Sequence, residues 1–128
     1  RMYALFLVVA GGGIGAGLRH GLNIAAARWF GVEFPWGTLA VNVIGSFLIG
    51  ALAAWFAFRG DNYTTNSLRL FLTTGILGGF TTFSAFSLDF VLLFERGDTM
   101  LAVVYVIASV VLSLAAIFAG LWLVRSFT

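Results

Sequence analysis

The sequence predicts an all-α membrane protein with four transmembrane helices in each subunit, and three observations lead to this fold class. Hydrophobic residues make up 61% of the 128 residues, and the charged side chains are only seven arginines and five carboxylates. About a quarter of the residues of a soluble domain are charged, so a soluble fold is excluded. Four apolar segments each exceed the roughly 20 residues that cross about 30 Å of hydrocarbon, and the connections between them are short.

We expect a single transmembrane domain over residues 1–128, with helices at about 2–29, 36–58, 68–94 and 100–124. Short connections make consecutive helices antiparallel neighbours, so both termini lie on the same side of the membrane. The chain has no cysteine and only one histidine, His20. This excludes disulfides, thiolate metal sites and a multi-histidine metal site within one chain. So few charges also exclude a nucleic-acid-binding surface.

The arginines are almost evenly divided between the two sides of the membrane. Arg1, Arg59, Arg69 and Arg125 lie on the side of the termini, and Arg19, Arg28 and Arg96 lie toward the other side. The excess of positive charge that fixes orientation is therefore small. Such a chain could insert in both orientations and form an antiparallel dimer. The alternative is a subunit whose orientation is set within a larger complex.

The first helix is rich in glycine. The pairs Gly11/Gly15, Gly13/Gly17 and Gly17/Gly21 have the four-residue spacing of closely packed membrane helices, and we expect them to pack in that way. The first of these glycines also match a dinucleotide fingerprint, but that motif needs a strand, a turn and a helix, so we reject it. Arg19 either reaches the far interface or attracts an anion into a vestibule.

The second and fourth helices each carry three polar side chains on one face. The spacing is i, i+4, i+8 in both sets, which are Thr38, Asn42 and Ser46, and Tyr105, Ser109 and Ser113. An amide in hydrocarbon needs a partner, so Asn42 either bonds to a neighbouring helix or lines a wet path. A lone serine often bonds to its own helix, but three polar groups in register favour a polar track.

The third apolar segment contains the stretch Gly75–Ser87, whose glycines, serines and threonines weaken a helix. In a bilayer, unwound backbone is tolerated only where it is buried in protein or lines a cavity. The stretch therefore indicates an ion or substrate site with free carbonyls. The alternative is that its small residues only let neighbouring helices approach closely.

Aromatic and acidic side chains follow in the same segment. Phe83, Phe86, Phe90 and Phe94 form a stripe at roughly helical spacing. Such stripes usually serve packing, but the electropositive edge of a ring can also contact an anion. Asp89 is the deepest carboxylate of the chain and is a functional candidate for that reason. Otherwise it lies near the helix end, paired with an Arg or a Tyr.

Together these motifs resemble the Fluc (CrcB) family of bacterial fluoride channels. The matching pieces follow in order over nearly the whole chain: GIGAGLRH at 13–20, FPWGTL at 34–39 with Asn42 and Ser46, GGFTTFS at 78–84, and Tyr105 with Ser109 and Ser113. The third piece is the most specific. Two positions depart from the pattern. Ala85 replaces a common Thr or Ser and removes a hydroxyl donor, and Asp89 stands where Glu is more frequent and has a shorter reach.

The resemblance implies a broken third helix and an antiparallel, dual-topology homodimer with two fluoride pores in the bacterial inner membrane. The residues implied for the fluoride pathway are Thr38, Asn42, Phe83, Phe86, Tyr105, Ser109 and Ser113. Arg19 would lie in an aqueous vestibule. A structural Na⁺ on the dimer axis would be held by the backbone carbonyls of Gly78 and Thr81. The implied partners are fluoride, the lipid bilayer and a second copy of the chain, with no nucleic acid.

The expected function is passive, fluoride-selective export that lowers cytoplasmic fluoride. An enzyme is not expected, because the sequence offers no nucleophile–base pair, metal cluster or phosphate loop. One alternative is a small four-helix, proton-coupled exporter of cations or drugs. It would need a membrane-embedded carboxylate, for which Asp89 is the candidate. A second alternative is an inert packing subunit of a larger complex.

Overall fold

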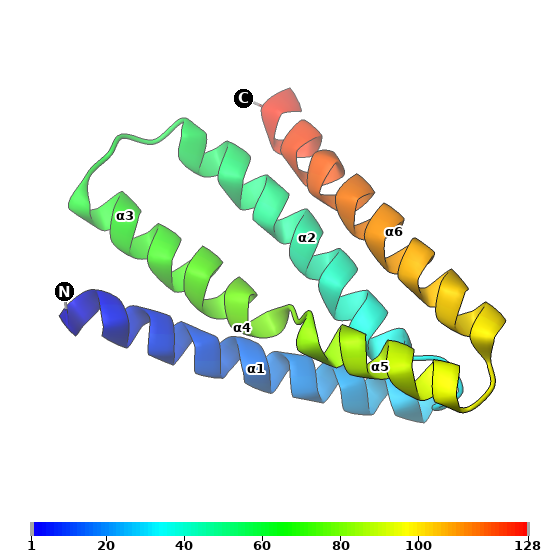
Figure 1. The fold of residues 1–128 in the computed structure, drawn as a ribbon. Coiled ribbons are helices and arrows are strands. Elements are labelled where there is room, and N and C mark those ends of the chain that lie inside the picture. Colours follow the sequence, from blue (N-terminus) through cyan, green and yellow to red (C-terminus); the bar gives the residue numbers. More distant parts are fainter. Residues whose placement is uncertain (1, 128) are drawn as a thin grey trace.

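The computed structural model describes residues 2–127, and its secondary structure over these residues is entirely helical. In chain order the elements are α1 (Met2–Phe30), α2 (Trp36–Ala57), α3 (Tyr63–Arg69), η1 (Leu70–Leu77), α4 (Gly78–Phe80), α5 (Ser84–Glu95) and α6 (Thr99–Ser126). Within residues 2–127, four helical stretches are long and apolar enough to cross a membrane, the third being 63–95. Figure 1 shows both described chain ends on the side of the α2–α3 loop. The expected charge at Arg1 lies outside the described residues.

Helix α1 packs against the third span through two of its glycines. A Cβ on Gly11 would lie 2.7 Å from the carbonyl oxygen of Phe71. A Cβ on Gly15 would overlap the carbonyl oxygen of Ile76. Backbones this close leave no room for any side chain, as is usual where membrane helices pack through small residues.

Three further glycines of α1 do not pack against another helix within the subunit. A Cβ on Gly13, Gly17 or Gly21 would meet nothing within 4 Å. The close packing expected from the spaced pairs is therefore present within the subunit at Gly11 and Gly15, and these three glycines take no part in it. The reason is geometric, because glycines two residues apart lie on different faces of a helix and only one face meets the third span.

Helices α2 and α6 form the second close pair, and the sequence reading did not identify its contacts. A Cβ on Gly50 would overlap the carbonyl of Ile117, and a Cβ on Gly120 would overlap that of Phe47. Each glycine thus faces the backbone of the other helix. This pairing fixes the polar face of α6 beside the polar face of α2.

The third span begins earlier than the expected residue 68. Asn62 has an extended backbone, and its side chain accepts a hydrogen bond of 2.9 Å from the backbone N–H of Thr65. This is an N-cap, which satisfies one of the free N–H groups in the first turn of a helix. Residues 63–67 fall in the expected connection because they lack the apolar character that marks a span.

Regular helix is interrupted in the middle of the third span. The π-helix η1 leads into the short helix α4, which ends at Phe80. Thr81 then has an extended backbone, with φ −82° and ψ 160°, and α5 begins at Ser84. Figure 1 shows this connection crossing beside α1.

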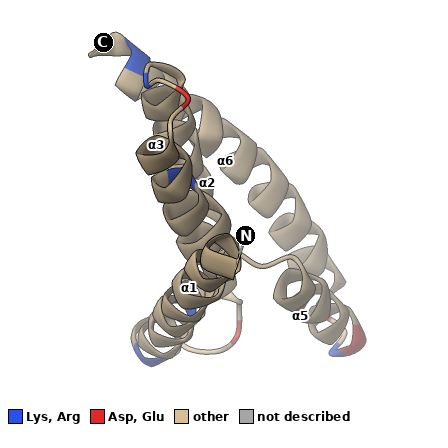
Figure 2. Cartoon of the chain, turned by 90° about the vertical axis from the view of Figure 1, so that its left-hand side faces the viewer, with Lys and Arg blue, Asp and Glu red and all other residues tan. Residues whose placement is uncertain are grey.

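Charged residues lie mostly toward the ends of the helices. Figure 2 shows long uncharged stretches of ribbon between coloured ends. This distribution is the one that a bilayer imposes, because charged side chains are costly in the hydrocarbon region.

Candidate functional site

The interruption of the third span is held by the side chain of Asn42 from α2. The backbone N–H of Thr82 donates to Oδ1 of Asn42 at 2.9 Å, and Nδ2 of Asn42 donates to the carbonyl of Thr82 at 3.0 Å. In a continuous α-helix, Thr82 N–H would donate to the carbonyl of Gly78. The Asn42 side chain therefore takes the place of the helical partners of both the N–H and the carbonyl of Thr82. Its predicted need for a partner at membrane depth is met by backbone and not by another side chain.

Further polar groups complete the hydrogen bonding around the interruption. Nε of Arg19 donates to the carbonyl of Gly79 at 3.2 Å. The Thr82 hydroxyl accepts from the backbone N–H of Ala85 at 3.1 Å and so satisfies one of the free N–H groups in the first turn of α5. The Thr81 hydroxyl donates back to the carbonyl of Leu77 at 3.0 Å. Arg19 thus lies against the interruption, whereas the sequence left open a position near the far interface.

A pocket of about 550 Å³ opens beside the interruption. Five of the predicted pathway residues line it, together with residues of the interruption itself: Asn42, Phe83, Phe86, Ser109 and Ser113. The lining comes from α2, the third span and α6, so residues distant in sequence meet at one place. No charged side chain is present among the described residues that line this pocket.

Ser109 is a buried polar residue in the lining of this pocket. Its side chain is buried, and its hydroxyl has no hydrogen-bond partner among the described residues. A buried polar group without a partner costs free energy, about 1–3 kcal/mol. A hydroxyl without a protein partner keeps its donor for a ligand or a water molecule that reaches it.

Aromatic rings connect the pocket to Tyr105. The ring centroids of Phe83 and Phe86 are 5.5 Å apart, and those of Phe86 and Tyr105 are 5.1 Å apart. Both pairs are tilted, at 48° and 43°. Phe83 is 77% exposed in the single subunit, whereas Tyr105 is completely buried. The row of rings therefore begins at an open surface and ends in the interior.

Tyr105 and Thr38 lie outside that pocket, next to Asp89. The Tyr105 hydroxyl donates to Oδ2 of Asp89 at 3.0 Å. This agrees with the reading of Asp89 as a carboxylate paired with a tyrosine. Thr38 is buried and, with Asp89, lines a second pocket of about 340 Å³. Of the predicted pathway residues, Thr38 thus lines the second pocket, and Tyr105 lines neither pocket but packs against Phe86 of the first.

The backbone at Gly78 and Thr81 has the chemistry that a Na⁺ site requires. Thr82 N–H, the usual helical partner of the Gly78 carbonyl, is bonded to Asn42 instead. Thr81 has left the helical conformation, which turns its carbonyl away from the helix axis. Neutral carbonyl oxygens are suitable ligands for a hard cation, and unwound transmembrane segments supply them. The residues therefore fit the predicted ion.

The sequence reading missed two contributions to this site. It did not identify Thr82 as the residue that Asn42 holds, nor Gly79 as the acceptor for Arg19. The sequence signal was the helix-weakening composition of Gly75–Ser87. It located the interruption but did not identify the residues that bond to it.

Comparison with known proteins gives one consistent family. The family model described as "CrcB-like protein, Camphor Resistance (CrcB)" matches residues 6–121. A protein of Mesorhizobium japonicum named "Fluoride-specific ion channel FluC" is 56% identical over 125 residues, which are 98% of this chain and 98% of that protein. "Fluoride-specific ion channel FluC 2" of Nitrobacter hamburgensis is 54% identical over 122 residues, covering 95% of this chain and 97% of that protein. Since both the family model and these relatives cover nearly the whole sequence, the chain belongs to the CrcB family.

Proposed function

We propose that this chain is a fluoride-selective ion channel that lets F⁻ leave the bacterial cell passively across the inner membrane. Full-length relatives named as fluoride-specific channels support the function. The observation in the structure that carries it is the uncharged pocket in which Ser109 offers an unpaired hydroxyl beside aromatic rings. A channel performs no covalent chemistry, so the chain is not an enzyme.

The pocket suits an anion that must shed water and still leave. Fluoride is strongly hydrated, so a pathway must replace its water with hydrogen-bond donors. Ser109 and Ser113 supply neutral hydroxyls, and Asn42 retains one amide hydrogen beyond its bond to Thr82. The edges of Phe83 and Phe86 add weak electrostatic attraction. A fixed arginine in the narrow part would bind the anion too tightly, since conduction requires sites that release the ion.

The direction of transport follows from acid–base chemistry. Neutral HF crosses membranes, ionises in the cytoplasm and is trapped as F⁻. A negative membrane potential then drives the anion outward through a passive pore. Such a channel lowers cytoplasmic fluoride without an energy source of its own.

We further propose that the working unit is an antiparallel homodimer of subunits inserted in opposite orientations. Phe83 is 77% exposed at the open side of the pocket. Ser84 and Ser87 are exposed nearby, where a lone subunit would place their hydroxyls against lipid. A second copy of the chain would cover this surface, and the nearly balanced arginines allow both orientations.

The interruption of the third span would be the broken helix of this dimer, with Na⁺ held on the dimer axis. The carbonyls of Gly78 and Thr81 would be its ligands in each subunit, and Arg19 would lie in a vestibule close by. The ion would bind the carbonyl oxygens of the interruption and would hold the two interruptions together. Fluoride efflux and dimer stability that do not change when Na⁺ is replaced by N-methylglucamine would contradict this assignment.

Replacing Phe83 with isoleucine is the test of the pathway. In liposomes that contain only this chain, we expect rapid fluoride efflux from the unchanged protein and efflux slowed about 100-fold or more by Phe83→Ile, a change of roughly 2.7 kcal/mol in the barrier. The reason is that isoleucine fills space but has no electropositive ring edge. A fluoride electrode measures the efflux directly.

Phe94→Ile is the matched control, because Phe94 is also exposed but lies outside both pockets described above. It should conduct like the unchanged protein. Equal rates for the two variants would remove Phe83 from the pathway, and efflux from neither variant nor the parent would contradict the channel itself.

A further inference from the structure

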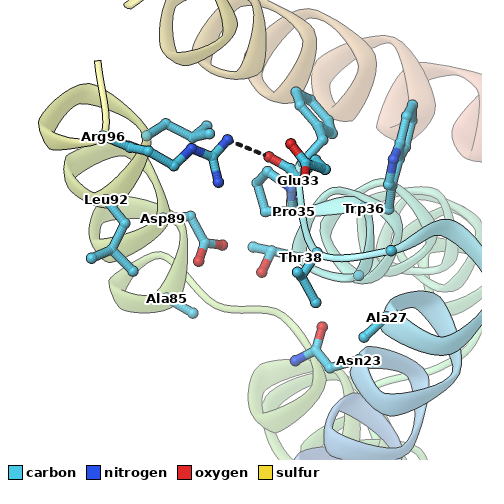
Figure 3. Close-up of a pocket in the computed structure, with 15 residues that line it drawn as sticks. Asn23, Ala27, Glu33, Pro35, Trp36, Thr38, Ala85, Asp89, Leu92 and Arg96 are labelled. Atoms are coloured by element: carbon cyan, nitrogen blue, oxygen red, sulfur yellow. Dashed lines mark hydrogen bonds between the residues drawn. The ribbon is translucent and has the colours of Figure 1, made fainter. Parts of the chain in front are cut away.

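The second pocket lies where two turns of the chain approach each other. It is lined by the end of α1, the 31–35 loop, the start of α2 and one face of α5. Gly31 lies in one turn and Gly97 in the other, with positive φ angles of 82° and 95°. This conformation favours glycine after a helix end. The polar side chains of Asn23, Thr38 and Asp89 face this space (Figure 3).

Arg96 connects the two turns. It follows the last residue of α5, and one terminal nitrogen (NH2) of its guanidinium donates to the backbone carbonyl of Glu33 at 2.6 Å. Its Nε donates to Oδ2 of Asp98 at 2.6 Å. Figure 3 shows the arginine reaching across to Glu33, with Asp89 and Thr38 facing each other below it. A single side chain therefore holds the 31–35 loop against the α5–α6 turn.

The loop that Arg96 holds is in contact with the interior polar pair. Phe34, next to Glu33, meets the ring of Tyr105 edge-on, with centroids 5.4 Å apart. Tyr105 in turn donates to Asp89. A displacement of the Glu33 carbonyl would thus move the ring that packs against Tyr105, because interiors are close-packed and transmit such shifts.

We infer that Arg96 is a positioning residue for fluoride conduction, which keeps the second pocket open and Tyr105 in place by holding the 31–35 loop. The inference rests on the proposed channel function. Arg96 does not act as a fluoride ligand in this account, since its charge is already paired with Asp98. It acts through the bond to the Glu33 carbonyl, which joins residues 63 positions apart.

Three variants separate this role from a general effect of charge. Arg96→Gln removes both interactions, and Asp98→Asn removes the ion pair but leaves the bond to Glu33 intact. Arg59→Gln removes an arginine at the opposite end of α2, where the guanidinium stacks on Trp55 at 4.0 Å. The side chains of Arg96 and Asp98 are 43% and 41% exposed, so the ion pair itself adds little stability and all three variants should fold.

The readout is fluoride efflux combined with the accessibility of the pocket. The chain has no cysteine, so Ala85→Cys introduces a single thiol into the lining of the second pocket. A small, negatively charged methanethiosulfonate reagent then measures how open that pocket is. We expect Arg96→Gln to slow efflux about tenfold, equal to roughly 1.4 kcal/mol in the barrier, and to change the modification rate by a similar factor. Asp98→Asn and Arg59→Gln should leave both quantities nearly unchanged.

Two results would overturn the inference. In one, Arg96→Gln conducts and is modified at the same rates as Arg59→Gln. In the other, Asp98→Asn reproduces the whole effect, which would assign it to the ion pair and not to the loop. Failure of the inference is distinguishable from failure of the channel. The parent chain conducts fluoride in both of these results, whereas it does not conduct fluoride if the channel proposal is wrong. Thermal unfolding in detergent shows whether a slowed variant is still folded.

Discussion

Replacement of Asn42 by alanine is expected to abolish fluoride efflux and to destabilise the third span. The substitution removes the two hydrogen bonds that hold Thr82, of 2.9 and 3.0 Å. A backbone N–H and a carbonyl at membrane depth would then lack partners, each at a cost of about 1–3 kcal/mol. Without Asn42 the segment between α4 and α5 can relax, and the pocket beside it loses both its shape and a donor. We expect efflux to fall at least about 100-fold.

The control is Asn66→Ala, which makes the same change at an asparagine whose side-chain hydrogen bonds are exposed. Asn66 bonds to Asp61 and Arg69 at the surface of α3 and lies in neither pocket. It should retain full efflux and nearly the parent's thermal stability. Asn42→Ala protein that keeps both properties would show that the interruption does not depend on this amide.

Gly15→Ala is expected to prevent the close packing of α1 against the third span. The added methyl group would overlap the carbonyl of Ile76 and lie 2.8 Å from the backbone N of Phe80. Overpacking of this kind costs about 1–3 kcal/mol, and more when backbone must move. Because the third span carries the interruption, a shift here should reduce fluoride efflux together with stability. Thermal unfolding and efflux of the purified variant measure the two effects.

Gly17→Ala tests the same substitution two residues later on α1. A Cβ there would meet nothing within 4 Å in the subunit, and alanine favours helix over glycine by about 1 kcal/mol. The subunit fold should therefore tolerate it. Equal destabilisation by Gly15→Ala and Gly17→Ala would contradict the described packing of α1.

The sequence predicted best the transmembrane spans and the polar helix faces, because each depends on the combined properties of several residues. Transfer of a long apolar segment into lipid involves all of its side chains, so the four spans are recognisable even though the polar residues 63–67 fall in the expected connection. The i, i+4, i+8 pattern likewise predicted that Ser109 and Ser113 share a face, and both line one pocket with Asn42. That fluoride passes along them stays a prediction.

The features that the sequence could not provide depend on contacts between distant residues. Asn42 and Thr82 are 40 positions apart, and the composition of neither segment specifies which backbone groups will meet. Gly50 and Gly120 allow α2 and α6 to touch, but an isolated glycine in an apolar helix has no pattern that reveals its role. Gly13 and Gly17 have the same four-residue spacing as Gly11 and Gly15. Only the position of the third span decides which pair packs within the subunit.

The most direct test of passive, fluoride-selective conduction is the charge movement that accompanies efflux. Liposomes that contain the chain are loaded with potassium fluoride or potassium chloride, and efflux is started with the potassium carrier valinomycin. We predict rapid fluoride efflux only after valinomycin is added, and almost no chloride efflux. We also predict continued fluoride conduction by Asp89→Asn, in which a neutral amide replaces the carboxylate bonded to Tyr105. A passive channel would be contradicted by fluoride efflux that does not depend on valinomycin, follows an imposed pH gradient and is abolished by Asp89→Asn. That result would indicate a proton-coupled transporter.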